Sequence, residues 1–153
     1  MLTLVESLSL AGDRAKQNDD ACGHSHGAAW VIDGATDLHE APLTGAASDA
    51  AWLAHTLDSA LHAYIVPGAG DAATLRTQLK AIIEELIRPW FEQLAEGQNF
   101  ERWQSPIASA LIAGETAAGV EGIDLGDCRI AALDAAGRSW LLGGPEAAAD
   151  AES

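Results

Sequence analysis

Three short acidic motifs follow one another along the chain and hold the side chains best suited to chemistry. They are Asn18-Asp19-Asp20, Asp33-Gly34 and Gly126-Asp127-Cys128-Arg129. Carboxylates, backbone carbonyls and water are the oxygen ligands that Mg²⁺ and Mn²⁺ prefer in proteins. Asp19, Asp20 and Asp33 are therefore predicted to form a site for a hard divalent cation.

The Asp33-Gly34 pair closes a short apolar run, Ala28 to Ile32, which predicts a buried strand that aims Asp33 rigidly from its tip. Gly34 has no Cβ, so its backbone carbonyl can approach a metal closely. An aspartate in this position can bridge two cations, and a water held between them becomes a hydroxide-like nucleophile near neutral pH. Each motif alone is common in turns, and the combination carries the prediction.

The N-terminal half of the chain is predicted to supply a strand, a hairpin loop and two helices that position these motifs. Imperfect apolar alternation predicts a strand over residues 2–10, and residues 22–27 are predicted to form a hairpin loop. Apolar residues at steps of three and four predict a helix over 44–65. A second helix is predicted to start at an N-cap, Asp71, and to be kinked or broken near Pro89, which lacks an amide donor. The short link between the helices predicts an antiparallel pair.

The pattern after Pro106 changes to short apolar runs separated by turns. Strands are predicted over residues 108–113, 119–123, 128–133 and 139–142. The 153 residues are most simply one domain, large enough to bury a core. The expected fold class is α+β.

Composition narrows the function classes. The chain has 23 acidic and 8 basic residues and a formal net charge of −15, which argues against binding to nucleic acid or to an anionic membrane surface. No apolar run approaches the roughly 20 residues that span a bilayer. The N-terminus has no basic segment of the signal-peptide type, and two cysteines do not form a disulfide framework. A cytoplasmic location is the expectation.

In order and context, the three motifs resemble the metal site of the type 2C metal-dependent serine/threonine protein phosphatases, and the resemblance runs from about Leu4 to Leu142. It implies a four-layer α-β-β-α sandwich with two antiparallel sheets inside. It also implies hydrolysis of phosphoserine or phosphothreonine in a phosphorylated protein substrate, with a metal-bridging hydroxide as the nucleophile. The implied cofactors are two Mn²⁺ or Mg²⁺ ions, with a third in some bacterial members.

The resemblance assigns roles to individual residues. Asp33 and Gly34 map onto the bridging carboxylate and the carbonyl ligand, and Asp19 and Asp20 onto the acids that hold the metals mostly through water. Asp127 maps onto the aspartate that helps to hold a third ion. Arg14 maps onto the arginine that binds the substrate phosphate, and Lys16 is a second cation in the same loop.

The sequence also departs from the family pattern. Ala35 stands where some members carry a histidine that acts as general acid, and Cys128 replaces the usual serine. Nothing after Arg129 resembles the later Asp-Gly strand and late aspartate that complete the first metal's ligands, so the sandwich is expected to be incomplete in these 153 residues. The alternatives are a catalytically inactive phosphatase-like binding or regulatory module, and a piece of a longer enzyme. Exposed strand edges would also allow a homodimer.

Overall fold

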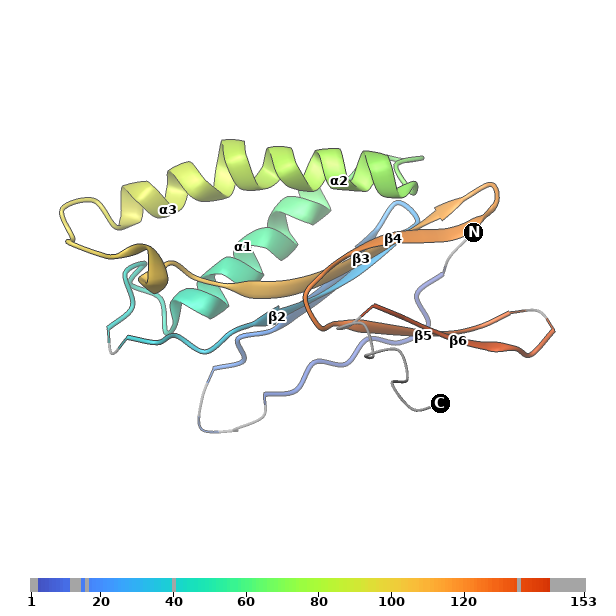
Figure 1. Ribbon diagram of the computed structural model, residues 1–153, viewed down its shortest axis with the longest axis horizontal. Coiled ribbons are helices and arrows are strands. Elements are labelled where there is room, and N and C mark those ends of the chain that lie inside the picture. The colour runs from blue at the N-terminus through green and yellow to red at the C-terminus, as the bar shows by residue number, and fades with distance from the viewer. Residues whose placement is uncertain (1–2, 12–14, 16, 40, 135, 144–153) are drawn as a thin grey trace, which may run out of the picture.

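The computed structural model describes residues 3–11, 15, 17–39, 41–134 and 136–143. Within them the chain forms an α+β structure in which helices cover one face of a four-stranded sheet and a two-stranded hairpin lies below the other face (Figure 1). The elements in chain order are β1 Ala21–Ser25, β2 Ala28–Gly34, α1 Asp49–Tyr64, α2 Ala72–Ala81, the π-helical segment η1 Ile82–Ile87, α3 Arg88–Leu94, the 3₁₀ turn η2 Arg102–Gln104, β3 Ala108–Thr116, β4 Gly119–Leu125, β5 Arg129–Leu133 and β6 Ser139–Gly143.

The larger sheet is antiparallel throughout, in the order β1-β2-β3-β4. β1 and β2 are joined by a two-residue turn, His26-Gly27, whose φ angles of 50° and 79° suit a tight hairpin. The prediction of a loop over residues 22–27 was therefore wrong for residues 22–25, which belong to β1. Those residues pair with β2, because an apolar partner strand outweighs their polar composition.

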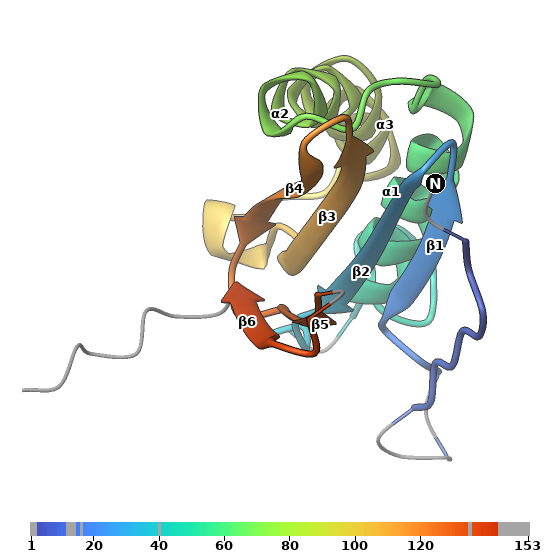
Figure 2. The same ribbon diagram turned by 90° about the vertical axis from the view of Figure 1, so that its right-hand side faces the viewer.

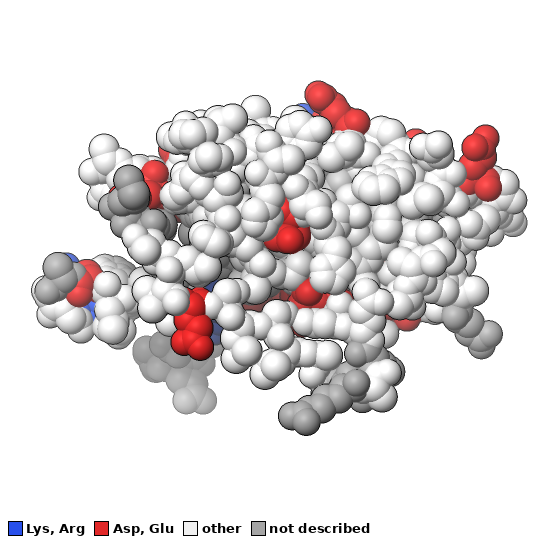
Figure 3. Space-filling view, turned by 180° about the vertical axis from the view of Figure 1, so that it is seen from behind, with Lys and Arg blue, Asp and Glu red and all other residues white. Residues whose placement is uncertain are grey.

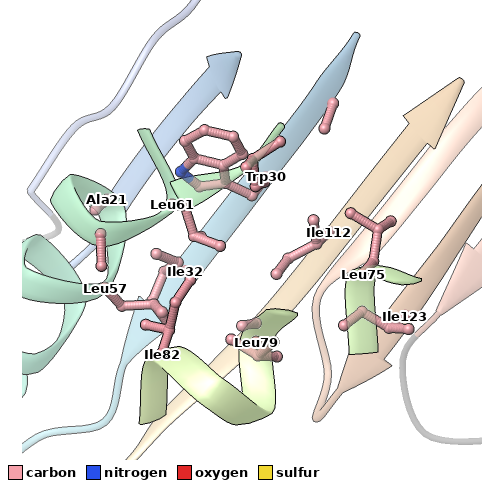
Figure 4. Close-up of a cluster of buried hydrophobic side chains, with 14 of the residues drawn as sticks. Ala21, Trp30, Ile32, Leu57, Leu61, Leu75, Leu79, Ile82, Ile112 and Ile123 are labelled. Atoms are coloured by element: carbon pink, nitrogen blue, oxygen red, sulfur yellow. The ribbon is translucent and has the colours of Figure 1, made fainter. Parts of the chain in front are cut away.

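Strand alternation separates the two faces of this sheet. Trp30 and Ile32 of β2 and Ile112 of β3 point towards the helices and are at most 3% exposed. Figure 4 shows them packed against apolar side chains of α1 and α2, among them Leu61 and Leu75. The ring nitrogen of Trp30 donates a hydrogen bond to Asp58 of α1 at 2.7 Å, so the polar atom of this buried indole is satisfied.

The helices begin at well-formed caps. Asp71 caps α2 as predicted, its carboxylate accepting from the Thr74 amide at 2.9 Å. The first helix starts at Asp49, five residues later than predicted, because Ser48 caps it by accepting from the Ala51 amide at 2.9 Å. The two helical segments run in opposite directions over the same face of the sheet (Figure 1).

Pro89 lies where the helix changes its hydrogen bonding. The helix continues from Ala72 to Leu94, but Ile82–Ile87 is π-helical and α3 begins at Arg88. The amide of Arg88 donates to the carbonyl of Ile83, five residues back. The predicted irregularity is therefore present at this position, as a widened turn rather than a break.

The other face of the sheet is only partly covered. Figure 2, viewed along the long axis, shows the β5–β6 hairpin below the sheet on the side away from α2 and α3. A hollow of about 530 Å³ lies between them, with Val31, Leu111 and Ile130 among its lining residues. The second sheet has two strands within the described residues.

The predicted strand over residues 2–10 was wrong for residues 3–10. This segment is irregular, and Val5, Leu8 and Leu10 are 95%, 74% and 73% exposed. Ser7 approaches Cys22 of β1 with 3.2 Å between its Oγ and the thiol sulfur. Apolar alternation alone does not form a strand, because a strand needs a neighbour to complete its ladder of hydrogen bonds.

Candidate functional site

Asp33 and Gly34 are the last two residues of β2. Ile32 points into the core, so Asp33 points to the opposite face of the sheet and is exposed there. Asp33 lies opposite Ser109 of β3 in the strand register. The prediction that a strand delivers this carboxylate from its tip is confirmed.

Asp20 immediately precedes β1, whose first residue, Ala21, pairs with Ile32. The antiparallel hairpin therefore brings Asp20 next to the end of β2. The carboxylate of Asp20 accepts a hydrogen bond from the Gly34 amide at 3.3 Å, and the Asp20 amide donates to the side chain of Asn18 at 3.2 Å. The Asn-Asp-Asp motif is thus folded into a turn that fixes Asp20 against the Asp33-Gly34 motif.

The carboxyl groups of Asp20 and Asp33 interact directly. Partial burial raises the pKa of Asp33 above its ordinary value, and three effects add to it: a side-chain hydrogen bond with Asp20, the negative charge of Asp20 and that of Asp127. A neighbouring negative charge opposes ionisation of a carboxyl group, so Asp33 holds its proton more firmly than a free aspartate. The negative charges of Asp20 and of Asp127, which is far from both in the sequence, therefore act together on Asp33.

Cys128 and Asp124 lie beside this acidic cluster, which comprises Asp20, Asp33 and Asp127. Burial raises the pKa of the Cys128 thiol, and the negative charges of Asp33, Asp127 and Asp124 raise it further. A cysteine with a raised pKa is a poor nucleophile at neutral pH. Asp124 was not singled out from the sequence; the signal was its position in β4 opposite Leu111, on the same face of the sheet as Asp33.

The side chain of Asp19 is bound to the start of α1. Its carboxylate accepts a hydrogen bond from the Ser48 hydroxyl at 2.6 Å, at the start of α1. Its backbone packs under Gly34, where an added Cβ would come within 2.3 Å of the Asp19 carbonyl oxygen. The glycine of the Asp-Gly motif is therefore required by the approach of the Asp19 backbone. A metal-ligand role for the carboxylate of Asp19 stays a prediction.

Arg14 and Lys16, the predicted phosphate-binding cations, lie outside the described residues.

A second group of side chains could hold a metal ion. Asp37, His39 and Asp49 each offer one ligand atom, and these atoms lie within 4.8 Å of one another. Sequence reasoning did not find this group, because Asp49 comes from α1 and the other two from the preceding loop. The only local signal was the spacing of Asp37 and His39, which is too common to be informative.

The carboxylates of this second group already have hydrogen-bond donors. Asp49 is fully buried and accepts from the amides of Leu43 and Thr44, both at 2.8 Å, from the Thr44 hydroxyl at 2.6 Å, and lies 3.0 Å from His39 Nε2. Burial raises the pKa of Asp49, but these hydrogen bonds outweigh it and lower the pKa. The roughly four lone-pair positions of a carboxylate are thus occupied.

Asp37 accepts from the amides of Asp49 and Ala50 at 2.7 and 3.1 Å, and so satisfies donors at the N-terminus of α1. Together with the bonds to Asp49, these contacts fasten the loop before α1 to the helix. These bonds account for both carboxylates of the group, but the buried Nδ1 of His39 has no hydrogen-bond partner among the described residues. The negative charges of Asp20 and Asp33, by contrast, repel each other when both groups are ionised.

No helix in the described part of the chain combines the length and the apolar character needed to cross a membrane. No protein-family model matches the chain, and comparisons with curated proteins and with solved structures give no match either.

Proposed function

We propose that the chain is a member of the type 2C metal-dependent phosphatases and hydrolyses phosphoserine or phosphothreonine esters with Mn²⁺ or Mg²⁺. The observation that carries this proposal is the contact between Asp20 and Asp33, with Asp127 close enough to raise the pKa of Asp33. Every neighbouring charge that shifts Asp33 is negative. Such a cluster weakens the folded state unless cations neutralise it, and a hard divalent cation fits its oxygen donors.

Each residue of the acidic cluster is proposed to have its own role in holding the cations. Asp33, Asp20 and the Gly34 carbonyl would hold the cations, and Asp127 would contribute from the turn before β5. Bound cations at such a site lower the pKa of a shared water and neutralise charge on the phosphoryl oxygens. The sheet keeps Asp33 in place, and the Asn18 side chain holds the turn that carries Asp20. Arg14 is proposed to bind the phosphoryl oxygens of the substrate.

The proposed fold is the four-layer sandwich of that family. In its support, helices form one outer layer, the four-stranded sheet forms an inner layer, and the β5–β6 hairpin lies against the sheet's second face. A phosphorylated protein is the proposed substrate and a cytoplasmic location the proposed setting. A homodimer through strand edges remains a proposal, with β1 and β4 at the edges of the larger sheet.

One observation favours the alternative, a phosphatase-like binding module without catalysis. The second sheet has only two strands within the described residues, and the hollow against the first sheet is lined mainly by apolar side chains. A module of this kind would bind a partner through that face. It could keep the acidic cluster and still lack turnover.

Hydrolysis of p-nitrophenyl phosphate, with and without Mn²⁺, tests the proposal. We expect Mn²⁺-dependent turnover that falls at least a hundredfold in Asp33→Asn and is unchanged in Glu85→Gln, an exposed acid on η1. A phosphothreonine peptide then tests the substrate class. Absence of turnover in the unaltered chain, at millimolar Mn²⁺, rules out catalysis by these 153 residues alone. The binding-module alternative would then remain.

A further inference from the structure

A long groove lies between the α2–η1–α3 helix and the β4 edge of the sheet, on the helix side of that sheet. It consists of two hollows of about 670 and 360 Å³ that share Leu79, Ile83, Arg88 and Leu125 in their walls. Volumes of this size are typical of small-molecule sites. Asp20, Asp33 and Asp127 do not line the groove, although Asp124, which lies beside them, lines its β4 edge.

The floor of the groove is apolar and partly open. Leu57 and Leu79 line it from the core, while Ile107 and Leu125 are 60% and 50% exposed. Trp52 of α1 forms part of the wall, and its ring centroid lies 5.8 Å from that of Trp90. An exposed apolar strip continuous with a concave wall suits an alkyl chain, whose burial contributes about 0.8 kcal/mol per methylene.

The rim concentrates positive charge in a strongly acidic protein. Four of the eight Lys and Arg residues line the groove: Arg76, Lys80, Arg88 and Arg102. Three acids also line it, Glu84, Glu92 and Asp124, against 23 acids in the whole chain. By contrast, the face in Figure 3 shows several acidic side chains and almost no basic ones.

The basic residues of the rim are largely unpaired. Lys80 lies 4.0 Å from Glu84, but Arg76, Arg88 and Arg102 have no ion-pair partner among the residues that the structure describes. Arg88 borders both hollows and follows the π-helical segment, a type of helix irregularity that is frequent at functional sites. A guanidinium in this position can bind a carboxylate through two parallel hydrogen bonds.

We propose that this groove binds a free fatty acid, with the carboxylate on Arg88 and the alkyl chain along the apolar floor. The unpaired arginines of the rim and the apolar floor together suit an anion with a long apolar tail. The proposal goes beyond the phosphatase activity and does not depend on it, since it uses none of the acidic motifs.

Quenching of tryptophan fluorescence by 12-bromododecanoic acid, kept below its critical micelle concentration, tests the proposal, because bromine quenches an indole at contact distance. We expect saturable quenching with one molecule per chain, which is lost when Trp52 is replaced by Phe. Arg88→Gln removes a charge-assisted hydrogen bond and should weaken binding about tenfold or more. Ile107→Asp, a change at an exposed position of the floor, should weaken it similarly.

Matched controls make the result decisive. Arg138→Gln removes the same charge from the β5–β6 hairpin and should leave the affinity unchanged. 12-Bromododecan-1-ol, which has the same tail but no charge, should bind about tenfold more weakly than the acid and equally well to Arg88→Gln. Quenching that does not saturate, equal losses in Arg88→Gln and Arg138→Gln, or equal affinity for the acid and the alcohol would each overturn the proposal.

Discussion

Replacing Asp33 by Asn should stabilise the metal-free protein at neutral pH. The amide has nearly the shape of the carboxyl group, but it cannot carry the charge that opposes Asp20 and Asp127. Because the pKa of Asp33 is raised in the folded state, its favourable contribution is complete below the unfolded pKa of about 3.9 and is lost as pH rises through the folded pKa. The unaltered protein therefore loses stability relative to Asp33→Asn as the pH rises.

The size of this effect is limited by solvent, because Asp33 is exposed. Charge pairs near a protein surface contribute about 0.2–1 kcal/mol, so we expect Asp33→Asn to raise the free energy of unfolding by about 0.5–1 kcal/mol. For a chain of this size, that corresponds to an increase in Tm of about 1–4 °C.

Thermal unfolding followed by circular dichroism measures this effect, in chelator at pH 7 and again at pH 3.5. The gain should be present at pH 7 and should become much smaller at pH 3.5, which is below the ordinary aspartate pKa of about 3.9. Addition of Mn²⁺ should reverse the order of stability, because a ligand at a hundredfold excess over its Kd stabilises the native state by about 2.7 kcal/mol and the variant binds it poorly. A lower or unchanged Tm of Asp33→Asn in chelator at pH 7 would refute the reasoning.

Two further substitutions test how residues near the acidic cluster contribute to stability and to Mn²⁺ binding. Gly34→Ala places a Cβ 2.3 Å from the Asp19 carbonyl oxygen, so it should destabilise the fold by about 1–3 kcal/mol and also weaken Mn²⁺ binding in a titration. Its control is Gly114→Ala, whose Cβ would lie 2.5 Å from the backbone of Gly70. This control should lose similar stability in denaturant unfolding without a change in Mn²⁺ affinity. Asp49→Ala should cost about 3 kcal/mol or more, because it leaves buried donors without an acceptor. Because the pKa of Asp49 is lowered, its contribution to stability is present above the unfolded pKa of about 3.9 and is lost as pH falls through the folded pKa. The difference in unfolding free energy between Asp49→Ala and the unaltered protein should therefore decrease in acid.

Local sequence patterns were sufficient to predict an element where its ends depend only on residues close in the sequence. Asp71 caps α2 because its side chain reaches an amide only three residues away. The strand ending in Asp33 was predictable because a short apolar run bounded by glycine has few other structures available. The four later strands also agree with their predictions to within three residues, because turns separate them clearly.

Features that depend on distant partners were not predictable. The apolar residues from Leu4 to Leu10 alternate as a strand would, but the described structure provides no ladder for them. The start of α1 is set by Ser48 and by Asp37 from the preceding loop, not by the apolar pattern that begins earlier. Long-range contacts, rather than propensity, decide such positions.

The candidate sites show the same contrast between features set by local sequence and features set by distant contacts. The sequence predicted Asp20 and Asp33 from residue type and spacing and Asp127 from a resemblance, and in the structure the charges of Asp20 and Asp127 both act on Asp33. It gave no indication of the groove, because Arg76, Arg88 and Arg102 are spread over a helix and a loop and converge only in three dimensions. Nor did it predict that Asp19 would bind Ser48.

Direct titration with Mn²⁺, followed by the loss of its free electron paramagnetic resonance signal, tests the central claim that the acidic cluster is a cation site. We predict binding that weakens at least tenfold in Asp33→Asn and in Asp127→Asn and is unchanged in Asp37→Asn, which alters only the second group. No binding at millimolar Mn²⁺ would contradict the account. So would binding that survives Asp33→Asn but is lost in Asp37→Asn, because the cation would then occupy the group formed by Asp37, His39 and Asp49.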